Sequence, residues 1–237
     1  MADAVVRTVL SQKGGVGKST ISMNLAATTA DVHTGGDPTA DSQTSLVSID
    51  PQGSVLWWGN RVPDLPFGIV QARHDQVDLL RKLPKSPTEK SFWVDTPGWM
   101  GHDGSADDPI AGLPFAKALH AVLDVSTTVI VPMMPESLCF DPTARTIEKL
   151  LEPRGLDFVV VINNWDPRDG EVDLEQTRLF VQKQGWPLAK TVLRRWKLHS
   201  RAAAEGAVVT TYPRNRAGME SRSDFAKLAI ELNVGVR

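Results

Sequence analysis

The chain has 237 residues, 41% of them hydrophobic and 23% charged, and a formal net charge of −2 at pH 7. It is long and apolar enough to bury a full core, and one α/β domain over residues 1–237 is the economical expectation. The near-neutral charge excludes a global positive excess, so any contact with nucleic acid needs a local basic patch, and the single cysteine excludes an intrachain disulfide and a multi-cysteine zinc site.

Apolar, β-branched runs alternate along the chain with segments of helical period, which is typical of a parallel sheet flanked by helices. Strands are predicted at residues 5–10, 45–49, 91–94, 127–132, 157–163 and 188–193. Helices are predicted at residues 18–29, 75–83, 114–123, 143–151, 174–184, 199–205 and 221–232, and residues 30–42 are interpreted as a polar loop. We therefore expect an α/β fold with a mostly parallel twisted sheet, helices on both faces, and a ligand at the carboxyl ends of the strands.

The first predicted strand leads directly into a glycine-rich segment, in which residues 11–20 read SQKGGVGKST. Glycines let the backbone turn tightly and aim several N–H groups at a polyphosphate, while a lysine neutralises the β- and γ-phosphate oxygens and a hydroxyl helps to hold Mg²⁺. The predicted phosphate-binding residues are Gly14, Gly15, Val16, Gly17, Lys18, Ser19 and Thr20. This segment predicts a nucleotide-binding protein.

Two aspartates follow predicted strands, Asp50 in the segment IDPQGS at residues 49–54 and Asp95 in FWVDTPG at residues 92–98. Phosphoryl transfer to water requires a phosphate cradle, a metal ion and a positioned water molecule. Ser19 and Asp95, directly or through water, are the predicted Mg²⁺ ligands, and Asp50 is the predicted catalytic residue that orients the attacking water. The structural alternatives are that Asp50 caps the loop before Pro51 and that Asp95 caps the turn after it.

The loop differs from the common P-loop pattern in having Gln12 at its first position and an additional lysine, Lys13. A lysine ahead of the glycines resembles the deviant Walker A loop of the ParA/MinD family of dimeric P-loop ATPases. Residues 49–54 and 92–98 resemble the D-P-Q-G and Walker B segments of that family, and residues 202–209, 212–213 and 223–229 resemble its closing elements. The resemblance covers nearly the whole chain, and it is nearest to small ParA-type partition ATPases that lack an N-terminal helix-turn-helix.

The resemblance implies a Mg²⁺-dependent ATPase with ATP as its nucleotide. It implies that Lys13 reaches across a homodimer interface to the partner's phosphates, in the manner of an arginine finger, so Lys13 is both a nucleotide-binding and a catalytic candidate. Adenine contacts are expected at Asn163, or its neighbour, and at Pro213. Alternatively, Lys13 contacts phosphate in its own subunit or is a solvated loop charge. Position 48 is a serine where the family often has a second aspartate, which leaves the division of work between metal and water open.

Seven cations near the C-terminus fall within about thirty residues: Arg194, Arg195, Lys197, Arg201, Arg214, Arg216 and Arg222. If they share one face of the dimer, they can bind the phosphates of duplex DNA without reading sequence. The alternative is a solvated surface in which they pair with Glu205, Glu220 and Asp224. The phosphate loop begins so early that we expect no helix-turn-helix ahead of it and no sequence-specific operator binding.

The leading function is therefore a ParA-like DNA partition ATPase, whose ATP-bound dimer binds non-specific double-stranded DNA and is released when a ParB-like centromere-binding activator stimulates hydrolysis. The alternatives are a MinD-like positioning ATPase on a membrane, an ATP-gated DNA-binding scaffold with little turnover, and a metabolic or redox P-loop enzyme. The first alternative needs an apolar, basic C-terminal helix, and the tail offers only Leu228, Ile230 and Leu232. The last needs a substrate domain or cluster cysteines, whereas Cys139 is expected to be a core thiol.

No stretch of the sequence approaches the roughly 18 apolar residues that cross a bilayer, and the N-terminus has no signal pattern. We expect a cytoplasmic, nucleoid-associated protein with no membrane partner. The segment at residues 98–112 is interpreted as a switch loop after the Walker B strand.

Overall fold

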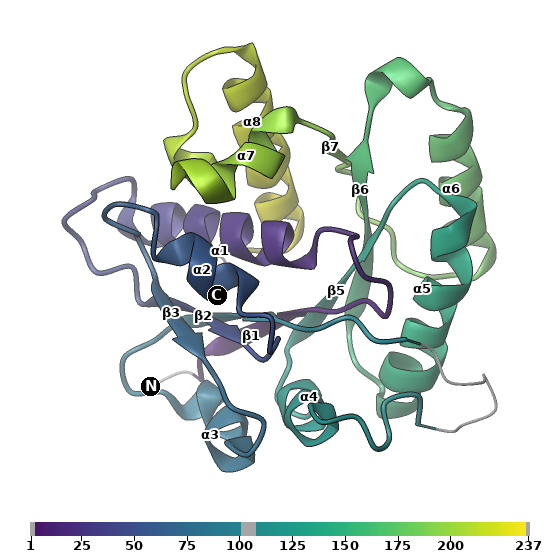
Figure 1. The fold of residues 1–237 in the computed structure, drawn as a ribbon, viewed down its shortest axis with the longest axis horizontal. Helices are drawn as coiled ribbons and strands as arrows, with labels where there is room; N and C mark the ends of the chain where they lie inside the picture. The colour runs from purple at the N-terminus through teal and green to yellow at the C-terminus, as the bar shows by residue number, and fades with distance from the viewer. Residues whose placement is uncertain (1–2, 101–107, 236–237) are drawn as a thin grey trace.

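The computed structural model describes residues 3–100 and 108–235, so part of the expected switch loop, residues 101–107, lies outside the described residues. The strands are β1 Val5–Val9, β2 Thr44–Ser48, β3 Gly68–Gln71, β4 Ser91–Asp95, β5 Thr128–Met133, β6 Phe158–Trp165 and β7 Leu193–Arg194. The α-helices are α1 Lys18–Thr34, α2 Ser54–Gly59, α3 Val77–Arg81, α4 Ala116–Leu123, α5 Phe140–Thr146, α6 Val172–Lys183, α7 Lys197–Glu205 and α8 Arg216–Glu231. Figure 1 shows how they surround one sheet.

All pairings between these seven strands are parallel, and the sheet order is β3-β2-β4-β1-β5-β6-β7. β1 lies at the centre between β4 and β5, and the register places Val9 opposite Asp95. The loop after β1 and the loop after β4 therefore begin at the same level of the sheet. This topology brings the glycine-rich loop beside the second predicted aspartate.

Alternate residues of the strands face two separate cores, as the period of two in a strand requires. In β4, Phe92 and Val94 belong to a core that also contains residues of α3, α4 and α6, whereas Trp93 belongs to a core shared with α1, α7 and α8. Figure 1 shows the two groups of helices on opposite sides of the sheet. The predicted α/β class, with helices on both faces of a parallel sheet, is confirmed.

The first helix is longer than its predicted range of 18–29, and the interpretation of residues 30–42 as a loop is wrong for its first part. α1 continues to Thr34 and ends at two glycines. Gly35 adopts a left-handed conformation with φ of 62°, and the Gly36 N–H donates to the Asp31 carbonyl at 3.0 Å. Glycine just after the last turn is common at the end of a helix, so Gly35 was the sequence feature that predicted where α1 ends.

The strand predicted at residues 188–193 is mostly absent. β7 has only two residues, and Leu188 forms an isolated bridge with Val160. The N–H groups of Lys190 and Thr191 donate instead to the carboxylate of Glu231 at 2.7 and 2.9 Å. A side chain from α8 thus takes the backbone donors that a ladder would use.

Three further elements differ from the predictions. β3 was not predicted because it is a four-residue edge strand whose residues are exposed or half-buried, so it lacks a clear apolar run. α2 was not among the predicted ranges. α8 starts at Arg216, five residues before its predicted start, because the Asn215 side chain caps it by accepting from the Gly218 N–H at 2.9 Å.

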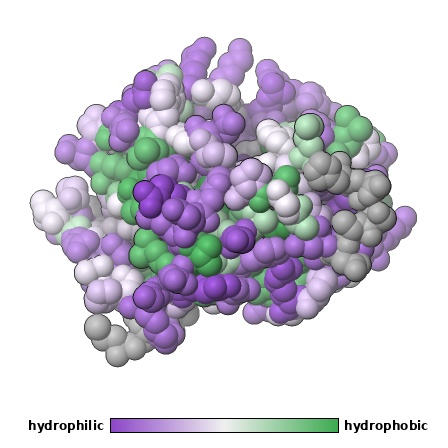
Figure 2. Space-filling view, turned by 60° about the horizontal axis from the view of Figure 1, so that its bottom comes forward, coloured by the Kyte–Doolittle hydropathy of each residue, from purple (hydrophilic) through white to green (hydrophobic). Residues whose placement is uncertain are grey.

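The surface view in Figure 2 shows hydrophobic residues in separate patches among hydrophilic ones. Exposed large apolar residues include Leu138, on the loop after β5, and Ile230, near the end of α8. Among the described helices, none is both long enough and apolar enough to cross a membrane.

Candidate nucleotide-binding site

The glycine-rich loop joins β1 to α1 at the carboxyl edge of the sheet. Gly15 and Gly17 have φ of 77° and 89°, a conformation that other residues rarely adopt. A Cβ atom on Gly17 would overlap the Asn163 amide nitrogen, whereas one on Gly14 or Gly15 would meet no atom within 4 Å. The loop is therefore packed against β6 on one side and open on the other, as a cradle for a ligand requires.

Lys18 is the first residue of α1 and is buried, with 8% of its surface exposed. Its Nζ donates to the Lys13 carbonyl at 3.1 Å, and no ion pair to it is found among the described residues. Burial lowers its pKa, while the nearby carboxylates of Asp95 and Asp50 raise it. Among the groups that the structure describes, a loop carbonyl is the one hydrogen-bond partner of this buried ammonium group, which is therefore suited to a phosphate that would supply negative charge.

Asp95 ends β4 and is fully buried. Its two carboxylate oxygens lie 3.0 Å from the Ser19 hydroxyl and 2.9 Å from the Ser22 hydroxyl. Burial raises the pKa of Asp95 to about 7, although the two hydroxyl groups act in the opposite direction. The carboxylate therefore changes protonation near neutral pH, and a bound cation would favour its charged form.

Ser22 was missed by the sequence analysis. It lies one helical turn after Ser19, so both hydroxyls face the end of β4. Its hydroxyl also lies 2.9 Å from the Lys18 carbonyl, and a single proton can serve only one of these two acceptors. Its spacing of three from Ser19 was the available signal.

Asp50 lies in the loop between β2 and α2, where its carboxylate both accepts a hydrogen bond within the loop and acts electrostatically on the nucleotide site. One carboxylate oxygen accepts from the Gln52 N–H at 2.9 Å, which is the capping arrangement considered as its structural alternative. Its charge also acts on the pKa values of Lys18 and Asp95, so Asp50 lies in their neighbourhood. Its backbone N–H donates to the hydroxyl of Ser48 at 3.2 Å. Ser48 thus helps to hold the loop that carries Asp50.

Lys13 differs from Lys18 in its surroundings. It is half-buried, and its Nζ donates to the carbonyl of Leu138 at 3.2 Å. Leu138 is 75% exposed. The neighbouring Cys139 is buried, as expected of a core thiol, and burial raises its pKa.

The turn after β4 lies close to the glycine-rich loop. The Trp99 N–H donates to the Gln12 carbonyl at 3.0 Å, and a Cβ atom on Gly98 would lie 3.2 Å from the Gly14 nitrogen and 3.2 Å from Lys18 Nζ. Only a glycine fits here without displacing the loop. The two loops are therefore in direct contact.

The two predicted adenine contacts lie in different environments. Asn163, in β6, donates to the Val16 carbonyl at 2.8 Å, so it is a neighbour of the phosphate loop. Pro213 is exposed in the loop before α8, and no hydrogen bond among the described residues joins it to the phosphate loop. An adenine role for either residue stays a prediction.

The seven C-terminal cations divide into three groups. Arg194 is bound by Glu220 and Asp224 at 2.6 and 2.8 Å, and Arg222 donates to the carbonyls of Val209 and Tyr212. Arg216 pairs with Glu220 at 2.8 Å but remains largely exposed. The exposed cations that form no ion pair with other described residues are Arg195, Lys197, Arg201 and Arg214.

The donor set fits Mg²⁺ bound together with a nucleotide. Within the described residues, no three His, Cys, Asp or Glu side chains form a metal-binding cluster. Ser19 and Asp95 instead offer a hydroxyl and a carboxylate beside the cradle, the oxygen ligands that Mg²⁺ takes together with substrate phosphates.

Comparison with known proteins agrees with this site. The family model for the CobQ/CobB/MinD/ParA nucleotide binding domain matches residues 7–209. A protein of Gloeobacter kilaueensis named maintenance of carboxysome distribution protein A is 30% identical over 229 residues, which are 96% of this chain and 94% of that protein.

Two solved structures have the same fold. The MinC:MinD cell division protein complex of Aquifex aeolicus matches with a TM-score of 0.69 and 13% identity, over 99% of this chain and 98% of that one. MinD of Pyrococcus horikoshii with Mg-ADP matches with a TM-score of 0.66 and 17% identity, over 97% and 96%. The chain belongs to the CobQ/CobB/MinD/ParA nucleotide-binding domain family, within which its phosphate loop identifies it as a ParA/MinD-type ATPase.

Proposed function

We propose that this protein is a Mg²⁺-dependent ATP switch that positions a cargo over DNA. ATP joins two copies of residues 1–237, each a single domain, and the dimer binds duplex DNA without sequence preference. A partner protein stimulates hydrolysis to ADP and phosphate, which separates the dimer from the DNA. The observation that carries this proposal is the different placement of two lysines of one loop, since Lys18 is buried beneath the cradle and Lys13 is half-buried at its open side.

Lys18 serves the nucleotide of its own subunit, because it is buried beneath the loop. Lys13 donates to the carbonyl of Leu138, which belongs to an exposed segment, and it also contacts the thiol of Cys139. A second subunit placed against this segment would bring Lys13 towards the partner's phosphates. Supplying a cation in trans makes the completed site depend on dimerisation, as an arginine finger does.

The two aspartates then have separate roles. Bound Mg²⁺ would neutralise the charge that develops on the phosphates during transfer, with Ser19 and Asp95 as its protein ligands. Asp50 orients the attacking water, and Ser48 supports its backbone. If the serine instead abolishes turnover, the protein is an ATP-gated scaffold, and a phosphate-release assay with DNA and partner present separates the two cases.

The exposed cations on and beside α7 are the proposed DNA contacts. Lys197 and Arg201 are four residues apart on α7, so they share a face of the helix. Arg195 precedes that helix, and Arg214 lies in the loop before α8. Arg194 and Arg222 are bound by groups of their own fold, so we propose that they stabilise the fold and do not contact DNA. The other five cations are the proposed DNA contacts, among which Arg216 is exposed but also paired with Glu220.

The similarity to a protein named for carboxysome distribution supports a cargo that has to be distributed within the cell. A DNA replicon that has to be partitioned is the other cargo consistent with non-specific DNA binding. A ParB-like activator remains the proposed partner, and the solved MinC:MinD complex supports a partner protein in general. A co-purification from the native host, with the ATP-bound protein as bait, identifies which cargo is present.

A membrane-bound alternative has less support. Of the three apolar tail residues, Leu228 is fully buried in the core and Leu232 packs against it, so only Ile230 is exposed. One exposed isoleucine gives little apolar area for insertion into a bilayer.

The test is binding to a random-sequence DNA duplex with ATP·Mg²⁺, with ADP·Mg²⁺ and without nucleotide, at two salt concentrations. We expect binding only with ATP, weakened by salt, and lost in Lys13→Ala. The double variant Lys197→Ala/Arg201→Ala should dimerise normally but bind DNA about tenfold or more weakly, whereas Lys183→Ala on α6 is the matched control. ATP-dependent dimerisation without DNA binding would contradict the DNA proposal and favour a membrane or protein surface.

A further inference from the structure

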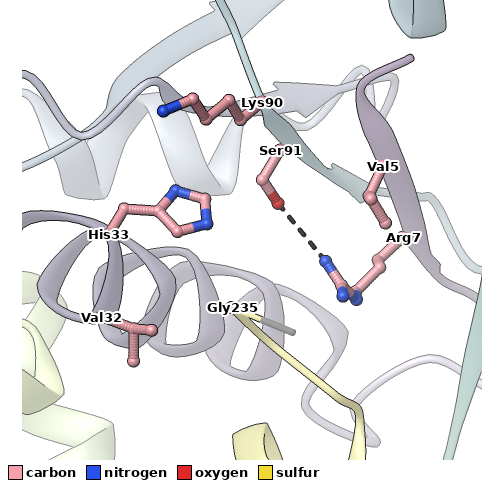
Figure 3. Close-up of a pocket in the computed structure, with 7 residues that line it drawn as sticks. All are labelled: Val5, Arg7, Val32, His33, Lys90, Ser91 and Gly235. Atoms are coloured by element: carbon pink, nitrogen blue, oxygen red, sulfur yellow. Dashed lines mark hydrogen bonds between the residues drawn. The ribbon is translucent and has the colours of Figure 1, made fainter. Parts of the chain in front are cut away.

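A second cavity lies at the opposite edge of the sheet, where the strands begin. Its volume is about 300 Å³, and its lining comes from the starts of β1 and β4, the end of α1 and the segment after α8. Figure 3 shows the side chains of Arg7, Ser91 and His33 directed towards the space between them, with Lys90 at the side. The nucleotide-site residues do not line it.

Arg7 is the unusual residue of this cavity. It stands in the central strand and is only 7% exposed, so its guanidinium has been taken out of water. Among the described residues, no carboxylate lies within ion-pair distance of it. Burial lowers its pKa to about 10, so it is still charged at neutral pH. A buried positive charge without a counter-ion is costly, because its hydration is lost.

The bonds that Arg7 does make are long. It lies 3.4 Å from the Ser91 hydroxyl and 3.4 Å from the carbonyls of Leu232 and Asn233, and its guanidinium carbon is 5.6 Å from the centre of a Trp93 ring. Charge-assisted hydrogen bonds are normally about 2.7–2.9 Å. These contacts hold the guanidinium in place but balance little of its charge.

The other polar groups of the lining also favour an anion. Lys90 is exposed at the start of β4 and makes no ion pair with any other described residue. His33 Nδ1 lies 2.9 Å from the Ser42 carbonyl, which fixes its ring at the wall. The lining contains neither aspartate nor glutamate among the described residues. A guanidinium, an ammonium and a hydroxyl around one space form the set of donors that oxyanions bind.

We propose that this cavity binds a small molecule through a phosphate or carboxylate group, which pairs with the guanidinium of Arg7 and is approached by Lys90 from the rim. The planar fork of an arginine suits both groups. The site is separate from the nucleotide site, and the proposal does not depend on the proposed function.

The competing explanation is that Arg7 only fastens the carbonyls at the end of α8, where a helix C-terminus favours a positive charge. The two explanations differ in what added anions do. A fastening role predicts that Arg7→Gln lowers stability and that anions have no specific effect. An anion site predicts saturable binding that disappears with Arg7.

The experiment is isothermal titration of the full chain with inorganic phosphate and, separately, with malonate, at constant ionic strength. The Lys18→Ala variant is titrated in parallel, because it lacks the lysine of the phosphate loop. Anion binding that this variant retains therefore occurs outside that loop. We expect saturable binding in both proteins. In the Lys18→Ala background, adding Arg7→Gln should make binding undetectable, and adding Lys90→Ala should weaken it about tenfold. Lys82→Ala, another exposed lysine just after α3, is the matched control and should bind as the unmodified chain does.

The anion that binds more tightly, phosphate or malonate, indicates whether the ligand is a phosphate ester or a carboxylate. If Arg7→Gln does not fold, the comparison of Lys90→Ala with Lys82→Ala decides, because both positions are exposed. No saturable binding at tens of millimolar of either anion overturns the proposal. Binding that is lost in Lys18→Ala but retained in Arg7→Gln also overturns it, since the anion would then occupy the phosphate loop.

Discussion

The two edges of the sheet each contain a buried cation, and the two cations are balanced in different ways. At the carboxyl edge, Lys18 donates to the carbonyl of Lys13 and lies near the carboxylates of Asp95 and Asp50. At the amino edge, the partners of Arg7 in the described part of the chain are carbonyl and hydroxyl oxygens at long distance and an aromatic ring. Helix α1 connects the two regions, since it begins at Lys18 and ends at the wall of the second cavity.

The difference shows what distinguishes a switch from a fixed charge. The carboxyl edge contains groups whose charges respond to one another, because Lys18 opposes the burial effect on Asp95 and Asp95 opposes that on Lys18. The cavity at the amino edge is lined by no described carboxylate that could respond. We therefore expect bound nucleotide to change the charges of Lys18 and Asp95 at the carboxyl edge. At the amino edge, we expect a bound anion only to supply a counter-charge to Arg7.

The largest expected effect separates the two cations. Lys18→Ala should lower ATP affinity about a thousandfold, because it removes one partner of a buried charged contact with the phosphates. Arg7→Gln should leave ATP affinity nearly unchanged, because Arg7 does not line the nucleotide site. Equilibrium binding of a fluorescent ATP analogue measures both. Similar losses of ATP affinity in the two variants would show that the two edges of the sheet are coupled, and would contradict the contrast drawn between them.

The second prediction concerns the proton of Asp95. Its pKa in the folded protein, about 7, is above the unfolded value near 3.8, so the folded state holds the proton more tightly. The nucleotide-free protein should therefore lose stability as the pH rises from about 4 to about 7 through this group. Asp95→Asn removes that loss, and we expect the variant to be more stable than the unmodified protein by about 3 kcal/mol at pH 8.

Thermal unfolding between pH 4.5 and pH 8 checks this, and the difference between the two proteins should shrink towards the acid end. Burial lowers the pKa of His199 to about 4, which gives the opposite slope in both proteins. Taking the difference between variant and unmodified protein removes the histidine contribution. A difference that is independent of pH would show that Asp95 is ionised throughout, and would contradict the burial argument. The same variant should lose Mg²⁺-dependent hydrolysis.

The smallest effect compares the two ends of α1. Gly17 and Gly35 both have positive φ, of 89° and 62°, so alanine at either costs about 1 kcal/mol of backbone strain. Only at Gly17 would the added methyl group also overlap the Asn163 amide, since nothing lies within 4 Å of the same position at Gly35. Gly17→Ala should therefore destabilise the protein by about 1–2 kcal/mol more than Gly35→Ala. Chemical denaturation measures the two free energies of unfolding, and equal values would mean that Asn163 moves aside at little cost.

Much of the site could be predicted because it depends on short segments. The glycine spacing of residues 14–17, the lysine at position 18 and the aspartate at the end of β4 are adjacent to strand ends, so a parallel sheet brings them together by topology alone. The contribution of Ser22 was missed although its spacing from Ser19 indicated it, whereas the hydrogen bond from the Asp50 N–H to Ser48 depends on a loop geometry that the sequence does not show. Arg194 was grouped with the exposed cations, since its sequence neighbours are basic and its partners lie on α8.

The limits of the secondary-structure predictions have the same origin. The end of α1 was readable from Gly35 and Gly36, but residues 188–193 have a strand-like pattern and form almost no strand, because Glu231 takes their N–H groups. A carboxylate some forty residues away is invisible to a local pattern. The single-domain assignment of residues 1–237 and the roles of Asn163 and Pro213 stay predictions.

The sequence by itself determined the α/β class, the phosphate cradle and its two aspartates, because these follow from local periodicity and from side chains close to glycine turns. Only the tertiary structure decided which cations are free and which are bound, since an ion pair depends on distance and not on spacing along the chain. It also decided that Arg7, one polar residue in an apolar strand, faces a cavity without a described carboxylate. Burial and charge balance are properties of the packed molecule, and no segment of the chain contains them alone.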